Sequence, residues 1–272
     1  MCGQKGGIRH ARWSNRITRA GFGEAVAFTP VADSELAFGE DAGLFDIMTT
    51  MRAMRRLKPD PVPAELVERL IEAASYAPSG GNNQTFSFVV ITDRDQIARL
   101  APIWRRIVTW YVTTQSPPEH MDAAAWGRLT ATLQHQADHF EEIPVLVIAC
   151  YEMRSAMKRM MGSLGRQRAG MSGLGARKAL TSMRNVNRMA VLAEAASIYP
   201  AVQNLLLAAR AHGLAATLTT WHLMFEQEIK KTLGIPGYVH TYAIVPIGWP
   251  AGNFGPVRRR DARESIHWQR WS

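Results

Sequence analysis

The sequence is poor in cysteine and in long apolar runs, and each shortage removes a class of protein. Its 272 residues include only 2 cysteines, which provide no disulfide framework. No apolar run approaches the roughly 20 residues that a membrane-spanning helix needs. The N-terminal region also lacks the continuous apolar stretch of a secretory signal. We therefore expect a cytoplasmic protein with reduced thiols and no membrane span.

Two common phosphate-binding motifs are also missing. A dinucleotide-binding domain would carry Gly-x-Gly-x-x-Gly directly after its first strand. The nearest approach is Gly173-Leu174-Gly175, which has no strand before it and no third glycine in register. The sequence has no Gly-Lys-Ser/Thr phosphate loop either. A conventional nucleotide-binding fold is therefore not expected.

The basic excess is concentrated in one segment. The formal net charge is +9, and nine Lys or Arg occur between Arg154 and Arg188 without any Asp or Glu. Such a segment attracts phosphate, whether in nucleic acid, lipid or nucleotide. No helix-turn-helix, zinc-finger or RNA-binding signature accompanies it. We expect a solvated basic flap and no nucleic acid partner, with a nucleic-acid or membrane-surface binder as an alternative.

The spacing of apolar residues predicts helices and strands in mixed order. Helices are expected near 43–54, from 63 to 77, over most of 94–142, in a long stretch ending at 211, and over 225–233. Strands are expected at 86–91, 145–151, 215–220 and 242–249. Residues 1–42 have the character of an irregular extension, and about 154–194 of a basic, Met- and Gly-rich insertion. The prediction is an α+β domain over 43–272, with a mixed sheet of about four to five strands surrounded by helices.

Three polar pieces hold candidate ligand-binding side chains. Arg52 and Arg55 lie near a predicted helix end, where guanidinium groups suit a phosphate. The stretch 77–84 reads Ala-Pro-Ser-Gly-Gly-Asn-Asn-Gln, so its glycines permit close backbone approach while its polar side chains donate and accept. The third piece combines the hydroxyl pair Thr219 and Thr220 with three arginines near the end of the chain, at residues 258–260. Each piece alone is equally compatible with a turn or a solvated surface.

In combination, these pieces resemble the nitroreductase family. The family motif Arg-Arg-Ser-x-Arg-x-Phe corresponds to residues 51–57, before a proline-rich connector at 58–63. The family motif Ala-Pro-Ser-Gly-Gly-Asn-x-Gln matches residues 77–84 position by position. The family's central helix, its Gly-Leu-Gly-Thr segment and its closing strand are similar to residues 197–209, 213–217 and 243–250. The resemblance covers about 43–151 and 195–265.

The resemblance implies an intertwined homodimer that binds FMN between its subunits. Arg52 and Arg55 would contact the phosphate and ribityl chain, helped by Arg258 or Arg259. The other implied cofactor-binding residues are Ala53 beside the phosphate, Pro78, Ser79, Gly80 and Asn82 from the second subunit, and Leu218, Thr219 and Thr220 along the isoalloxazine ring. Met51 and Ala53 stand where the family has Arg and Ser, so two side-chain contacts to the phosphate are missing.

The implied activity is FMN-dependent oxidoreduction with ping-pong kinetics. Hydride would pass from NADPH or NADH through the flavin to a nitroaromatic, a quinone or a similar small acceptor. Since the flavin carries this chemistry, no catalytic acid or base is assigned. The alternatives are an FMN-storage protein without turnover and an enzyme of the same fold acting on enones, halogenated aromatics or flavin itself.

Several other side chains are expected to have structural roles. His135 and His139 have the spacing of a zinc pair on a helix, yet we expect them to be solvated, and no metal is assigned. Cys150 ends a predicted buried strand and is expected to be an inert core thiol. His222 follows the Thr pair, and a structural role is favoured over proton donation.

Overall fold

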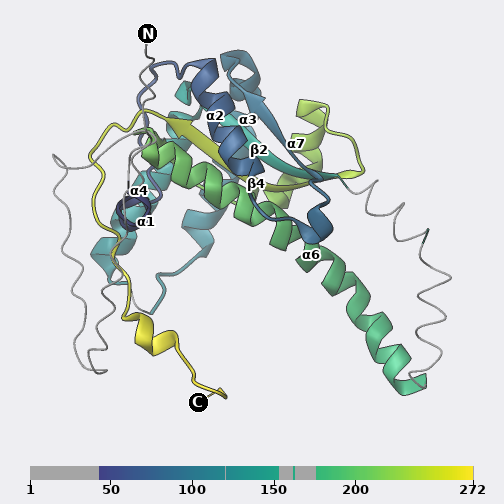
Figure 1. The fold of residues 1–272 in the computed structure, drawn as a ribbon. Helices are drawn as coiled ribbons and strands as arrows, with labels where there is room; N and C mark the ends of the chain where they lie inside the picture. The colour runs from purple at the N-terminus through teal and green to yellow at the C-terminus, as the bar shows by residue number, and fades with distance from the viewer. Residues whose placement is uncertain (1–42, 120, 153–161, 163–175, 272) are drawn as a thin grey trace, which may run out of the picture. The chain divides into compact units, whose positions relative to one another are not determined.

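A computed structural model describes residues 43–119, 121–152, 162 and 176–271, all within one compact unit (Figure 1). Within these residues one four-stranded sheet has the order β1-β2-β4-β3. Its strands are β1 (Phe86–Ile91), β2 (Val145–Glu152), β3 (Ala215–Ala216) and β4 (Val239–Gly248). The α+β class agrees with the sequence prediction, and β1 and β2 lie where strands were expected. β3 is shorter than the predicted strand 215–220, with only an isolated bridge at Thr219 beyond it, and β4 begins at Val239, before the predicted residue 242.

The strand pairings are antiparallel in every pair that the structure describes, which corrects the predicted mixed sheet. The chain leaves β1 through helix α3 (Arg94–Thr114) and returns through helix α4 (Ala123–Asp138). Because these two helices bring the chain back to the end where β1 finished, β2 starts there, with Ile91 opposite Leu146. β2 therefore runs against β1.

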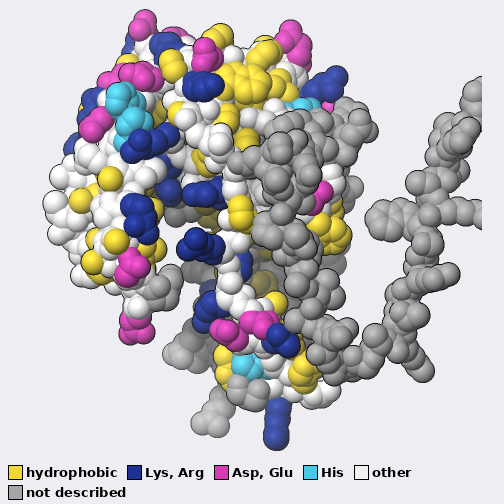
Figure 2. Space-filling model, turned by 90° about the vertical axis from the view of Figure 1, so that its left-hand side faces the viewer, with side chains coloured by type: hydrophobic (Ala, Val, Ile, Leu, Met, Phe, Trp, Pro, Cys, Tyr) yellow, Lys and Arg dark blue, Asp and Glu magenta, His cyan; other side chains and the backbone are white. Residues whose placement is uncertain are grey.

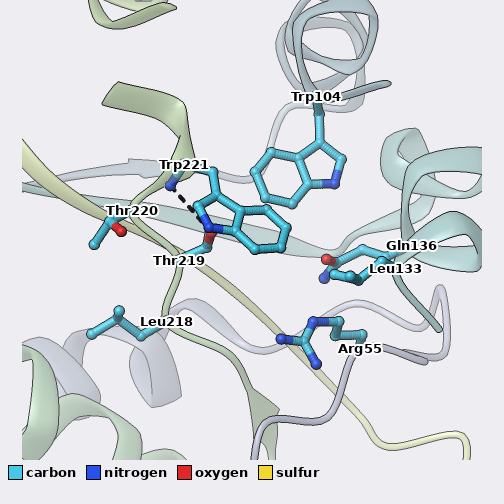
Figure 3. Close-up of a pocket in the computed structure, with 8 residues that line it drawn as sticks. All are labelled: Arg55, Trp104, Leu133, Gln136, Leu218, Thr219, Thr220 and Trp221. Atoms are coloured by element: carbon cyan, nitrogen blue, oxygen red, sulfur yellow. Dashed lines mark hydrogen bonds between the residues drawn. The ribbon is translucent and has the colours of Figure 1, made fainter. Parts of the chain in front are cut away.

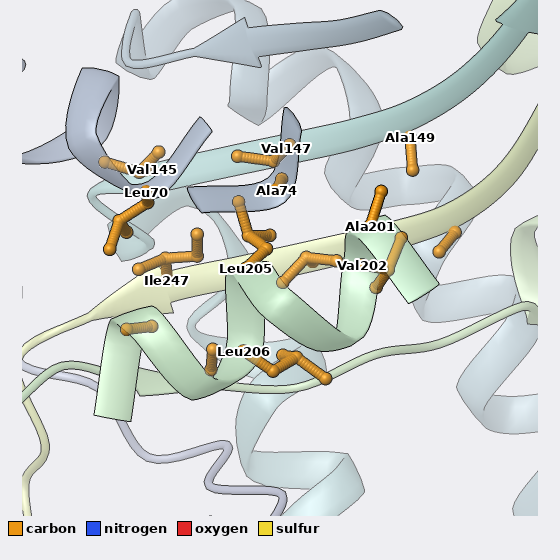
Figure 4. Close-up of a cluster of buried hydrophobic side chains, with 14 of the residues drawn as sticks. Leu70, Ala74, Val145, Val147, Ala149, Ala201, Val202, Leu205, Leu206 and Ile247 are labelled. Atoms are coloured by element: carbon orange, nitrogen blue, oxygen red, sulfur yellow. The ribbon is translucent and has the colours of Figure 1, made fainter. Parts of the chain in front are cut away.

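Helices cover both faces of the sheet. Alternate residues of β2 point to opposite sides, as the two-residue period of a strand requires. Val145 and Val147 face helices α2 (Ala64–Ser75) and α6 (Ala176–Ala211), where Figure 4 shows them against Leu70 and Leu205. The side chains of Leu146, Ile148 and Cys150 pack on the other face against α3, α4 and helix α7 (Glu226–Leu233).

The end of the chain lies along the segment that follows helix α1 (Leu44–Thr50). Leu57 forms a bridge with Pro250, and the Ala251 N–H donates to the Arg56 carbonyl at 3.0 Å. Farther along, the Val257 N–H donates to the Thr49 carbonyl at 2.8 Å. These bonds bring two arginine-rich segments together, although about 200 residues separate them in sequence.

Helix α6 begins earlier than the sequence predicted. The basic segment was expected to be irregular to residue 188, but α6 starts at Ala176, directly after the last glycine of that segment. Ala, Arg, Lys, Leu and Met recur in its first turns, and these residues favour helix. The predicted extension 1–42 and the predicted flap at 153–161 and 163–175 lie outside the described residues.

One stretch of α6, Arg188–Ala211, is long and apolar enough to cross a membrane by length and composition. Its second half supplies the side chains that cover the sheet, including Ala201, Val202 and Leu205, which are fully buried. A core helix meets the same criterion, and the second half of this stretch belongs to the core.

Candidate functional site

A pocket of about 160 Å³ opens beside the sheet, between α3, α4 and the segment that follows β3 (Figure 3). Its wall combines aromatic, hydroxyl, amide and guanidinium groups, contributed by Arg55, Trp104, Leu133, Gln136, Leu218, Thr219, Thr220 and Trp221. A volume of this size is below the roughly 300 Å³ at which whole drug-sized ligands are accommodated. The pocket therefore suits one end of a larger ligand.

Arg55 extends its guanidinium group into this pocket. Among the residues that the structure describes, no hydrogen-bond acceptor or carboxylate pairs with it. Burial lowers the pKa of Arg55, while the nearby Tyr111 raises it by a smaller amount. Guanidinium nevertheless stays protonated in proteins, so the pocket contains a positive charge that an anionic or carbonyl oxygen would satisfy.

The backbone around Arg55 is held against the sheet by hydrogen bonds. The Thr217 hydroxyl donates to the Met54 carbonyl at 2.9 Å, and the Met54 N–H donates to the Ala216 carbonyl at 3.5 Å. Met54 is thus tied to β3 and to the residue that follows it, while on the other side of Arg55 the Arg56 carbonyl accepts from the N–H of Ala251, which follows β4. This fixes the point from which the Arg55 side chain enters the pocket.

Two further hydrogen-bond donors in the wall have no partner. Trp104 Nε1 and Gln136 Nε2 are buried and form no hydrogen bond in the described part of the chain. Both side chains are only 3% exposed, and both line the pocket with Arg55. Neither residue could be predicted from the sequence, because a tryptophan and a glutamine on two long helices carry no local motif.

The predicted residues Leu218, Thr219 and Thr220 form the side of the pocket opposite the helices. Thr219 is anchored to β4 by two backbone hydrogen bonds with Ile244, of 3.0 and 2.9 Å. Trp221 continues this side, and its ring stacks on Tyr111 with centroids 3.9 Å apart. The chain therefore presents its Thr pair from a rigid support.

His222 follows Trp221 in the chain, and its side chain is fully buried. Its Nε2 is 3.1 Å from the Thr241 hydroxyl, which in turn donates to Glu226. Burial lowers the pKa of His222 to about 4, although Glu226 acts to raise it. The ring is neutral at pH 7 and lies among hydrogen-bonded residues, which agrees with the predicted structural role.

The predicted phosphate-binding arginines meet at a second place, outside the pocket. Arg52, Arg258 and Arg259 are exposed. The backbone hydrogen bond from Val257 to Thr49 brings the segment that contains Arg258 to the end of α1. In the same segment Gly255 lies close to the Arg52 guanidinium, since a Cβ atom at position 255 would be 3.7 Å from Arg52 Nη1. Figure 2 looks onto the side where α1 and α4 lie and shows several Lys and Arg side chains along this face. Ala53 lies between Arg52 and Arg55 and is also exposed.

The glycine-rich stretch forms a short, irregular turn around η3 (Gly80–Asn82). Gly81, Asn82 and Gln84 have positive φ angles of 61, 50 and 49 degrees. Left-handed backbone is uncommon outside glycine and clusters at ligand-binding sites. The Gly80 N–H donates to the Ser197 hydroxyl at 3.1 Å, which fixes this turn to α6.

In one chain, the structure does not bring this turn to the pocket. The turn contacts α6 on one face of the sheet, whereas α3 and α4, which line the pocket, cover the other face. Pro78, Gly80 and Asn82 are exposed, and Ser79 is partly exposed. A ligand that contacts both the pocket and this turn would need two copies of the chain.

Two other expected roles can be compared with the structure. Cys150 is buried, and burial raises the pKa of its thiol to about 11, so it is the inert core thiol that was predicted. The rings of His135 and His139 lie 4.4 Å apart, and His139 Nδ1 is 3.0 Å from Glu142. Within the described residues, no group of three His, Cys, Asp or Glu side chains is arranged to hold a metal ion.

An antiparallel sheet between two layers of helices defines an α+β domain, and a pocket lined by hydrogen-bond donors lies beside the sheet. The model of the nitroreductase family matches residues 49–249. The chain therefore belongs to the nitroreductase family. It is 26% identical to a Thermus thermophilus protein named NADH dehydrogenase over 224 residues. This alignment covers 80% of this chain and 92% of that protein.

Solved structures show the same fold. A BluB-like flavoprotein from Clostridium difficile 630 has a TM-score of 0.59 at 20% identity and covers 84% of this chain and 99% of its own. Oxidized iodotyrosine deiodinase, solved with FMN and 3-iodo-L-tyrosine, has a TM-score of 0.56 at 17% identity and covers 84% of this chain and 100% of its own. At such identities the similarity concerns the fold alone.

Proposed function

We propose that the protein is an FMN-dependent oxidoreductase that uses NADPH or NADH to reduce a small acceptor such as a nitroaromatic or a quinone. Membership of the nitroreductase family and a relative named NADH dehydrogenase support an oxidoreductase. The observation that carries the proposal is the partly buried Arg55 guanidinium, which has no partner among the described residues and enters a pocket beside Thr219 and Thr220. A ligand with acceptor oxygens would supply that partner.

The described side chains fit both ends of FMN. The exposed arginines Arg52, Arg258 and Arg259 provide a positive site for the phosphate, since guanidinium binds phosphate oxygens through two parallel hydrogen bonds. In this proposal they compensate for Met51 and Ala53, which lack the family's polar contacts. Arg55 would lie nearer to the ring and the ribityl chain, because its side chain enters the pocket.

The proposed active form is a homodimer. A flavin that contacts Pro78, Ser79, Gly80 and Asn82 as well as the pocket needs a second copy, because the sheet separates the two groups in one chain. Apolar side chains exposed on α1, on α6 and near the C-terminus support such an interface, namely Leu44, Phe45, Met48, Met189, Val191, Leu192, Ile266, Trp268 and Trp271.

The described residues would bind and orient the reactants. When bound, FMN supplies reversible two-electron chemistry. Arg55 and the Thr pair would fix the ring, and the stacked Tyr111 and Trp221 would keep water from one side of it. The nicotinamide and the acceptor would lie on the same flavin face in turn, which predicts ping-pong kinetics.

Among the described residues, the eight that line the pocket include no His, Cys, Asp, Glu, Lys or Tyr side chain. His222 is buried, with a pKa of about 4, and Cys150 is buried, with a pKa of about 11. Neither group changes its protonation state near pH 7. The proposal therefore assigns no catalytic residue and leaves proton delivery to the ligands and water.

The test is a visible spectrum of the purified protein with FMN, taken before and after anaerobic addition of NADPH or NADH. We expect bound flavin bands that bleach with at least one nicotinamide. No flavin binding with excess FMN would refute the proposal. Flavin that binds but stays oxidised with both nicotinamides would support a second candidate, an FMN-storage protein, which the altered positions Met51 and Ala53 favour.

A further inference from the structure

Two unpaired donors in the pocket wall are not explained by the proposed binding residues. Trp104 Nε1 and Gln136 Nε2 come from α3 and α4, and both line the pocket in which Arg55 ends. A buried donor without an acceptor is destabilising, and native proteins contain few of them. The occurrence of two such donors in one small pocket indicates a ligand with at least two acceptor atoms.

The core holds both side chains in place. The Trp104 ring stacks on Phe140 with centroids 5.7 Å apart, and Leu133, one turn before Gln136, is 1% exposed. The two donors are therefore fixed without help from a ligand. Figure 3 shows the Trp104 and Gln136 side chains on the helix side of the pocket, across from Thr219 and Thr220.

The chemistry of the wall restricts the ligand. An indole nitrogen only donates, whereas a carboxamide both donates and accepts. Together with the Arg55 charge, the wall matches a planar edge that carries carbonyl oxygens beside an N–H group. The pyrimidine-dione edge of an isoalloxazine ring has this arrangement, with an N–H between two carbonyl groups. The pocket volume of about 160 Å³ admits such an edge and excludes the whole ring system.

We propose that Gln136 and Trp104 bind the pyrimidine-dione edge of the flavin ring, with the Gln136 carboxamide paired to the ring N–H and a neighbouring carbonyl. This inference rests on the proposed FMN binding and adds two binding residues from α3 and α4. Since hydrogen bonds to the ring tune its electronics, both residues also contribute to the flavin reduction potential.

The experiment compares FMN with 3-methyl-FMN, in which a methyl group replaces the edge N–H proton. Affinities are measured by flavin fluorescence for the wild type, for Gln136→Ala and for the control variant Gln134→Ala. Gln134 is an exposed residue on the same helix, and its side chain donates to Asp138. We expect the wild type to bind 3-methyl-FMN at least tenfold more weakly than FMN. Gln136→Ala should weaken FMN binding about tenfold and lose most of this discrimination, whereas Gln134→Ala should match the wild type.

Trp104→Phe provides a second readout, because it removes the indole N–H and keeps an aromatic ring. The midpoint potential of the bound flavin should become more negative in this variant. Equal wild-type affinity for the two flavins, or full discrimination in Gln136→Ala, would overturn the inference while FMN binding itself persists. Unchanged FMN affinity in Gln136→Ala would assign the donors to an ordered water. Failure of the wild type to bind FMN would overturn the proposed function as well.

Discussion

Replacing Arg55 by methionine should stabilise the ligand-free protein and weaken FMN binding. The change removes a partly buried charge and keeps a long, unbranched side chain. Without ligand, the guanidinium loses part of its contact with water and gains no hydrogen bond among the described residues. A fully buried polar group without a partner costs about 1–3 kcal/mol, and a partly exposed one costs less. The free energy of unfolding should rise by up to about 1 kcal/mol, and the melting temperature by about 2–4 °C per kcal/mol.

The same change should have the opposite effect on FMN affinity. A hydrogen bond from a charged donor contributes about 1.5–3 kcal/mol, so its loss should raise the Kd for FMN about 10- to 150-fold. Thermal melts with and without FMN measure the first effect, and flavin fluorescence titrations at fixed salt measure the second. FMN should then raise the melting temperature of the variant less than that of the wild type.

Arg56→Met is the matched control, because it removes the same charge from an exposed position next in sequence. Its stability should change by less than about 0.5 kcal/mol, and its FMN affinity should stay close to that of the wild type. The reasoning fails if Arg55→Met is less stable than the wild type without ligand. It also fails if the two variants bind FMN equally well.

Two further predictions concern pH dependence and assembly. His222 has a folded pKa of about 4 against 6.5 in the unfolded chain, so below about pH 6.5 unfolding takes up a proton. The free energy of unfolding should therefore fall by up to about 3 kcal/mol as the pH drops from about 6.5 to about 4. Urea titrations at about pH 7 and about pH 4.5 should show this loss in the wild type. The loss should be smaller in His222→Gln. Trp268 and Trp271 are 71% and 87% exposed, and replacing both by alanine should shift the protein from dimer to monomer in light scattering and lower its FMN content. A double variant that remains dimeric would remove these side chains from the proposed interface.

Local signals predicted most of the fold. Asp93 follows the predicted strand 86–91, and its side chain accepts a hydrogen bond from the Asp95 N–H and thereby caps α3. Gly234 follows the predicted helix 225–233, and its φ of 67 degrees is the left-handed cap that ends α7. Such residues act through their immediate neighbours, so their effect is visible in the sequence. The direction of strand pairing depends on how α3 and α4 return the chain, and no short segment encodes it.

The candidate site was predicted only where a motif marks it. Arg55, Thr219 and Thr220 were found from short patterns, and the structure brings them into one pocket. Trp104 and Gln136 were missed because their importance depends on the absence of partners, which is a property of the packed protein.

The position of the glycine-rich turn, on the opposite side of the sheet from the pocket, has a genetic consequence. If each flavin lies between the pocket of one copy and the turn of the other, a chain with a damaged pocket and a chain with a damaged turn can complement each other. In a mixed dimer both defects fall in one site, and the other site is assembled from two undamaged halves. Two inactive alleles expressed together would then restore activity that neither provides alone.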